Sequence, residues 1–286
     1  MRTTRLFIWI FLLIGVACST DEEVMDMEIQ ITNPLNIEEN AMVNCILEDL
    51  LCEIEKNVIQ ADYGTNIKDN TKRDSIPLVK IQQEASENSL TTLSINYGNT
   101  DQTDHLGRLK RGEIITQIKG RFSQNQSEQE IKFNNFYINK MKVDGSITIK
   151  SMGYNNYDQP SFSISYDSLL FTCESGLSYS IAGNKIKEWI EGFETPENPW
   201  DDQFLISGDT YGTNSENREY KSKILTPLLI SRACEFILSG ETEFTIEDEA
   251  VIYNFGDGLC DNKGSYIRED EKHQFEFGRY TFRQKH

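Results

Sequence analysis

The sequence predicts a mainly β protein, with a large antiparallel sheet or sandwich preceded by one N-terminal amphipathic helix. Short runs of alternating apolar and polar residues recur after Thr91, as in Val143 to Lys150, and this period of two is typical of half-buried strands. One segment before them has the three- and four-residue spacing of a helix. No second long helical pattern follows to supply crossovers, so the strands are expected to pair antiparallel.

The chain begins with a segment typical of an export signal. Arg2 and Arg5 precede an apolar run, residues 6 to 17, which ends at Cys18. A membrane span needs about 20 apolar residues, so this run is too short to cross a bilayer. Val16 and Ala17 are small enough for a signal peptidase. We therefore expect residues 1–17 to be removed as a signal peptide.

The residues around Cys18 resemble a bacterial lipoprotein signal, in which the cysteine after the cleavage site is acylated. Gly15 stands where Leu is usual, with Ile14 before it, as in the relaxed signals of Bacteroidetes lipoproteins. The acids Asp21 to Glu23 resemble the tag that exports such proteins to the outer face of the outer membrane. The resemblance implies palmitate at Cys18 and a surface-exposed outer membrane lipoprotein. An ordinary secretory cleavage and an uncleaved anchor are the alternatives.

Residues 18–36 are acidic and without periodicity, which predicts a lipidated tether. Loss of Arg2 and Arg5 with the leader changes the net charge from −18 to −20. Phosphate backbones and anionic lipid surfaces repel such a chain, so no nucleic acid partner is expected and the membrane is reached through the lipid anchor. The apolar content of 38% is enough for a sizeable core.

Residues 37–90 are expected to form a helix followed by a loop. Apolar residues from Met42 to Ile59 recur mostly at three- and four-residue steps, which predicts a helix over Glu38 to Gln60. Residues 61 to 90 are rich in Asp, Asn and Thr, which indicates a loop. The antiparallel β domain is expected over residues 91–286. Besides the alternating runs at 143 to 150 and 161 to 166, strands are expected at residues 93–97, 113–122, 129–138, 203–210, 220–225, 228–232, 236–246, 250–255 and 274–282.

The chain has five cysteines besides Cys18. An exported protein lies in a compartment where disulfides persist. Cys45 and Cys52 are about 10 Å apart along the expected helix, too far to bridge. Cys234 and Cys260 flank a hairpin-like stretch and form the expected disulfide. The alternative is that both are small buried apolar groups. Cys173 has no expected partner.

A series of motifs along the β domain resembles a group of Bacteroidetes envelope lipoproteins. The series includes Ile95-Asn96-Tyr97-Gly98, then Val143-Asp144-Gly145, then Phe255-Gly256-Asp257-Gly258-Leu259-Cys260-Asp261. The resemblance covers about residues 91 to 270 and implies a β-rich envelope protein. It implies no reaction, because the group has no assigned activity. The segments at 93–99 and 251–257 also resemble each other, through an internal duplication or through chance.

Three constellations are candidates for ligand sites. Trp189, Trp200, Asp201 and Asp202 combine aromatic faces with carboxylates, as sugar sites do, and the alternative is a loop pinned to the sheet. Asp257, Asp261 and Asn262 offer hard oxygens for Ca²⁺, and the alternative is a turn capped by its own side chains. Arg108, Lys110 and Arg111 lie in an expected hairpin turn, where they either bind an acidic group or are merely solvated.

These features predict a lipid-anchored cell-envelope protein that acts as a non-catalytic binding or structural module, with a glycan or an envelope protein as partner. No resident cofactor is expected beyond the Ca²⁺ hypothesis. The alternatives are a surface polysaccharide-acting enzyme and a calcium-stabilised adhesin-like domain. The enzyme would need a concave pocket with two convergent carboxylates, whereas a module would present broad faces.

Overall fold

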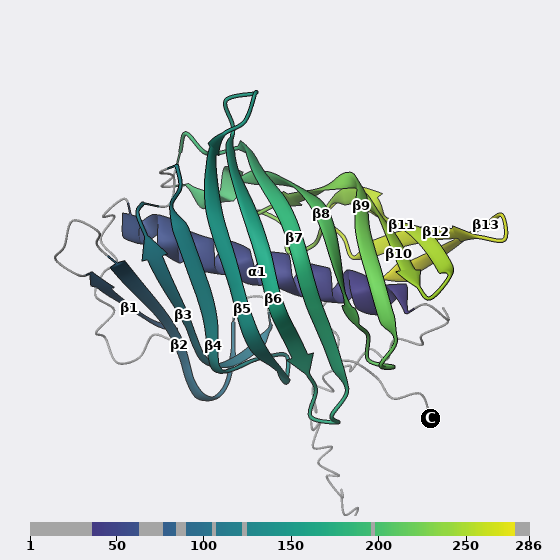
Figure 1. Ribbon diagram of the computed structural model, residues 1–286, viewed down its shortest axis with the longest axis horizontal. Coiled ribbons are helices and arrows are strands. Elements are labelled where there is room, and N and C mark those ends of the chain that lie inside the picture. Colours follow the sequence, from purple (N-terminus) through teal and green to yellow (C-terminus); the bar gives the residue numbers. More distant parts are fainter. Residues whose placement is uncertain are drawn as a thin grey trace, which may run out of the picture. The chain divides into compact units, whose positions relative to one another are not determined.

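The protein is described by a computed structural model that covers residues 36–62, 77–83, 90–104, 107–121, 125–195 and 198–277. In this part, thirteen strands form one sheet whose order follows the chain, and each strand pairs antiparallel with its neighbours. The helix α1 crosses one face of this sheet (Figure 1). The predicted mainly β fold with one N-terminal helix is therefore confirmed, as a single sheet rather than a sandwich.

The elements follow one another with short connections, as expected for an antiparallel meander. Their bounds are α1 Ile37–Asp62, β1 Leu78–Gln83, β2 Leu90–Thr103, β3 Leu109–Lys119, β4 Glu128–Ile138, β5 Met141–Tyr154, β6 Pro160–Thr172, β7 Ser178–Glu191, η1 Pro199–Asp201, β8 Gln203–Thr213, β9 Glu219–Ser231, β10 Ser239–Ile246, β11 Glu249–Asp257, β12 Lys263–Arg268 and β13 Glu271–Glu276.

Helix α1 confirms the helix predicted over residues 38 to 60. Its first turn is closed by the carbonyl of Asn36, which accepts hydrogen bonds from the N–H groups of Glu39 at 3.2 Å and Asn40 at 3.4 Å. Glu38 and Glu39 lie in the first turn, at the positive end of the helix dipole. Among the described residues, no helix combines the length and the apolar composition of a membrane span.

The sheet is bent along a row of β-bulges, which we call the bulge row. Its positive-φ residues include Gly98, Gly112, Gly145, Gly183, Gly208, Gly240 and Gly256, and the strand registers shift beside them. A bulge bends its strand and increases the local twist. The row runs from β2 to β11, so the bend continues across most of the sheet.

Contacts with α1 show how strong this bend is. Tyr97 of β2 donates to Glu53, and Tyr253 of β11 donates to Asn40. These two helix residues lie about 20 Å apart along the axis. In a flat sheet, nine strand spacings would separate β2 from β11 by about 43 Å. The inner face of the sheet must therefore curve around the helix.

The motifs of the suspected duplication share one local geometry. In each, an asparagine side chain accepts a hydrogen bond from the glycine two residues later, Asn96 from Gly98 at 2.8 Å and Asn254 from Gly256 at 2.7 Å. The aromatic residue between them is buried in both cases, Tyr97 and Phe255. Both motifs are members of the bulge row, so the similarity in sequence corresponds to a shared bulge geometry.

Four sequence predictions about elements are wrong. Leu78–Gln83 lies in the expected loop, yet it forms β1 and pairs with β2. The segment around Trp189 belongs to β7 instead of a loop. The sequence pattern did not indicate a strand there, because Lys185 and Lys187 stand on its inward side and interrupt the apolar alternation. Lys110 lies in β3 instead of a hairpin turn. The expected breaks between 225 and 228 are also absent, since β9 is continuous.

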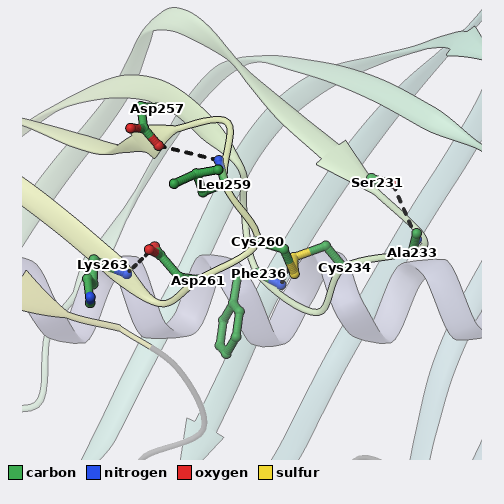
Figure 2. The surroundings of a disulfide bond; sticks show 9 residues. All are labelled: Ser231, Ala233, Cys234, Phe236, Asp257, Leu259, Cys260, Asp261 and Lys263. Carbon is green, nitrogen blue, oxygen red and sulfur yellow. Dashed lines mark hydrogen bonds between the residues drawn. A yellow bond between two sulfur atoms is a disulfide. The ribbon is translucent and has the colours of Figure 1, made fainter.

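The predicted disulfide between Cys234 and Cys260 is confirmed. It joins the connection after β9 to the connection after β11 (Figure 2). The other described cysteines, Cys45, Cys52 and Cys173, do not take part in this disulfide. The predicted signal peptide, Cys18 and the tether up to residue 35 lie outside the described residues.

The bulge row makes a prediction that separates backbone contact from backbone strain. A Cβ at Gly112 would stand 2.0 Å from the carbonyl oxygen of Asn135, whereas a Cβ at Gly98 would meet nothing within 4 Å. Both glycines have positive φ, 88° and 82°, so Ala carries a similar strain of about 1 kcal/mol at either position. Gly112→Ala should lower the free energy of unfolding by at least about 2 kcal/mol more than Gly98→Ala, as measured by urea titration. Equal losses in the two variants would contradict a backbone contact at this bulge.

Candidate functional site

Five buried basic side chains project from the sheet and its connections toward α1. We call them the inner cations: Arg108, Lys110, Lys185, Lys187 and Arg232, whose side chains are no more than 5% exposed. An unpaired buried cation costs several kcal/mol. The inner cations therefore require partners, and α1 supplies most of them.

The first group of contacts joins α1 to β7. Lys185 donates to Glu48 at 2.9 Å and to Asn44 at 3.0 Å, and Lys187 donates to Glu55 at 2.5 Å. Lys185 and Lys187 are two residues apart, so they share the inward face of the strand. Glu48 and Glu55 are seven residues apart, so they share one side of the helix. The two-residue spacing of the lysines along the strand and the seven-residue spacing of the glutamates along the helix therefore bring one glutamate to each lysine.

Arg232 extends this group beyond β9. Its guanidinium binds Glu55 at 3.3 Å and Asp202 at 3.0 Å. Asp202 also accepts a hydrogen bond from the indole nitrogen of Trp189 at 3.2 Å. Burial raises the pKa of Asp202 to about 6, although Arg232 and Trp189 act in the opposite direction.

The second group of contacts joins α1 to β2 and β3. Arg108 is bound to Asp49 of the helix and, at 2.5 Å, to Asp104. Lys110 is bound to Glu53 and, at 3.2 Å, to Asp104. The hydroxyl of Tyr97 donates to Glu53 at 2.6 Å. Three carboxylates therefore converge on two cations.

A cavity of about 730 Å³ lies beside these contacts. Its helix wall includes Cys45, Cys52 and Lys56, and the segment 230–237 with the disulfide forms another wall. Glu48, Asp49, Glu53 and Asp104 also line it, together with Arg108 and Arg232. The two groups of ion pairs therefore hold α1 in place and contribute to the surface of the cavity.

Burial makes the thiols in this wall poor nucleophiles. The pKa of Cys45 is raised to about 12, chiefly because burial disfavours the thiolate. Burial also raises the pKa of Cys52. Since the thiolate is the reactive form, neither thiol is suited to attack a substrate.

The four residues predicted for a glycan site lie close together but differ in exposure. Trp200 lines the cavity and is 57% exposed. Trp189 and Asp202 are buried in the contacts of Arg232, and Asp201 accepts a hydrogen bond from Thr195 at 2.8 Å. The alternative is a segment pinned to the sheet by Trp189, Phe193 and Trp200. Trp189 is buried and contacts Phe193, with 6.4 Å between the ring centres, whereas Trp200 is largely exposed.

The residues predicted for Ca²⁺ lie at the end of β11 and in the turn after it, and each carboxylate accepts a hydrogen bond from a different backbone N–H group. Asp257 accepts from Leu259 at 3.4 Å and Asp261 from Lys263 at 3.0 Å (Figure 2). The backbone carbonyl of Asn262 accepts a hydrogen bond from the N–H group of Phe277 at 2.8 Å. Within the described ranges, no cluster of three or more His, Cys, Asp or Glu side chains is arranged to hold a metal ion.

The basic residues Arg108 and Lys110 are neither solvated nor open to an external acid, which corrects both expectations. They are 4% and 0% exposed, and acids of the same chain bind them. Arg111 is the exception, since it is partly exposed and pairs with Asp101 at 2.7 Å.

The position of a basic residue in the strand pattern indicates an inner cation, whereas the residue type alone does not. Along β7 the buried positions are Tyr179, Ile181, Lys185, Lys187 and Trp189. The two lysines keep the odd-numbered register of the apolar residues. A basic residue in the inward register of a strand, opposite a helix with an acidic stripe, is the pattern that indicates such a contact.

Comparison with protein family models, with curated proteins and with solved structures gives no match for this chain. The chemistry of the site therefore has to be argued from its own contacts.

A buried ion pair should be costly to break and much less costly to replace as a whole. Lys185→Met should lower the free energy of unfolding by about 3 to 5 kcal/mol, because it leaves Glu48 buried without its cation. Adding Glu48→Gln should recover part of this loss, as measured by urea titration of the single and double variants. The control is Lys132→Met, since Lys132 pairs with Glu130 on the surface at 2.8 Å with side chains 56% and 40% exposed, and it should cost less than about 1 kcal/mol. Additive losses in the double variant would contradict a direct pair.

Glu39 should make the stability of the fold depend on pH. Burial raises the pKa of this carboxyl to about 7, although the N–H of Ser215 donates to it. The folded state therefore holds the proton that the unfolded chain releases near pH 4.5, and stability falls as pH rises from about 4.5 to 7. Between pH 5 and 8 the chain should lose up to about 3 kcal/mol that Glu39→Gln retains. Urea titrations at both pH values test this, and parallel losses in the two proteins would exclude Glu39 as the source.

Proposed function

We propose that this chain is a lipid-anchored cell-envelope protein that works as a non-catalytic binding module, with the cavity beside α1 as its ligand site. The export and acylation part of the proposal is supported by the residues around Cys18. Those residues lie outside the described part, so the argument for them remains one of sequence. The resemblance to Bacteroidetes lipoproteins supports an outer membrane location with exposure at the cell surface.

The binding part rests on one observation about the cavity. Four of its carboxylates, from Glu48, Asp49, Glu53 and Asp104, each bind a buried Lys or Arg side chain. A general acid or base must exchange its proton during the reaction. Here, protonation of such a carboxylate would remove one ion pair of a buried cation. The arrangement therefore suits a rigid binding surface better than acid and base catalysis.

The size of the cavity supports a small ligand or the side chains of a partner. Ligand sites commonly enclose about 300 to 1,000 Å³, so 730 Å³ falls within the usual range. The exposed ring of Trp200 adds an aromatic face at this site. A glycan or an envelope protein remains the partner class that we propose.

Acylation gives the most direct test of the envelope part. The wild-type chain expressed in a bacterium of the proposed type should incorporate a tagged fatty acid and sediment with membranes. Cys18→Ala should lose the label and leave the membrane fraction, because the thiol is the acyl acceptor. Cys173→Ala, which removes a buried cysteine of the β domain, is the matched control and should keep the label. A labelled Cys18→Ala protein would contradict the proposal, and release of sugars from envelope polysaccharide by the purified chain would contradict the non-catalytic part.

A further inference from the structure

The partly exposed carboxylates that line the cavity, which we call its mouth, present negative charge, and the cations that they bind are more deeply buried. The side chains of Asp49, Glu53 and Asp104 are 19%, 21% and 16% exposed. The cations that they bind, Arg108 and Lys110, are 5% and 0% exposed. Three carboxylates share two cations, so the cluster keeps one net negative charge, and its carboxylates are the groups that reach solvent.

An aromatic ring in the same cavity already has a cation beside it. The ammonium of Lys56 lies 5.4 Å from the centre of the Trp200 ring. This separation is within the range in which the negative face of the ring attracts a cation. Lys56 and Trp200 both line the cavity. The ammonium of Lys56 therefore lies beside the ring face that a ligand cation could bind, either next to Lys56 or in its place.

The inner part of the cavity combines apolar groups with one unsatisfied acceptor. Ile230, Phe236 and Ile237 line it together with the disulfide. Glu48 also lines it and is 2% exposed, and its Oε2 atom has no hydrogen-bond partner within the described structure. A buried acceptor without a partner is costly. Lys185 holds the other oxygen of this carboxylate at 2.9 Å, so the apolar side chains are the part of this wall that a ligand body can contact.

We infer that the cavity takes an amphipathic organic cation, whose apolar body packs against Ile230, Phe236 and Ile237 and whose ammonium lies between Trp200 and the carboxylates of the mouth. The inference rests on the proposed function, because it names the ligand class of the same cavity. The net charge of −18 adds a field that attracts cations over longer distances. A neutral sugar would use the ring of Trp200 without using the charge of the three carboxylates.

Three probes with the same apolar body test the charge directly. The full chain, purified in a non-ionic detergent, is titrated by calorimetry with 4-phenylbutylamine, 4-phenylbutanol and 4-phenylbutyrate, with detergent alone as the blank. The amine should bind about tenfold more tightly than the alcohol, and the acid should bind most weakly. The preference should shrink as salt is raised from 50 to 500 mM.

Two positions in the cavity wall and one control locate the site. Trp200→Ala should weaken binding of the amine about tenfold, whereas Lys56→Gln should strengthen it about threefold because it removes the competing ammonium. Tyr157→Ala is the matched control, since this 81% exposed aromatic lies in the turn between β5 and β6 and not in the cavity wall. It should leave the affinity unchanged.

Several outcomes would overturn the inference while leaving the proposed function standing. Equal binding of the amine and the alcohol would remove the role of charge, and tightest binding of the acid would reverse it. Saturable binding of a neutral oligosaccharide without binding of the amine would assign the cavity to glycans. Absence of saturable binding by all three probes would also overturn it. Failure of the proposed function would instead show in the acyl-labelling and polysaccharide assays.

Discussion

Docking of α1 depends on charge pairing across the inner face of the sheet. The inner cations are nearly without solvent contact, and a buried cation without a counter-charge costs several kcal/mol. Carboxylates of α1 bind all five, with Asp104 and Asp202 as additional partners. The sheet therefore depends on the helix to neutralise its interior, and the helix depends on the sheet to occupy its acids.

The same contacts fix how α1 sits. A helix held only by apolar packing can often slide or rotate at modest cost, because many apolar arrangements are similar in energy. A shift of one residue along the chain would rotate the helix face by about 100°. Glu48 would then move away from Lys185, and Glu55 from Lys187 and Arg232. The ion pairs thus select one register for the helix, and the bulge row supplies the curvature that brings the strands to it.

The sequence predicted the elements better than it predicted the site. Helical spacing identified α1, strand alternation identified most of the sheet, and the spacing of Cys234 and Cys260 identified the disulfide. β7 was missed because its inward lysines break the apolar alternation. The contacts around the cavity could not be predicted from the sequence, because they join segments that are far apart in the chain. Glu48 of the cavity wall, for example, binds Lys185 across 137 positions. Local patterns carry no information about such a pairing. Residue type therefore offers Trp200 as a candidate without indicating which distant residues share the cavity with it.

The polarity of the cavity follows from the way in which the helix is held. Arg108 and Lys110 must be enclosed, because their role is to bind carboxylates away from water. The carboxylates on the outer side of this cluster then face the solvent, so the mouth becomes acidic even though the cluster is almost neutral. An added negative group at the mouth would meet these carboxylates before it met either cation. A positive group would meet attraction first, and it would not need to break any pair that holds α1. The arrangement that stabilises the helix therefore also decides which sign of charge can approach it.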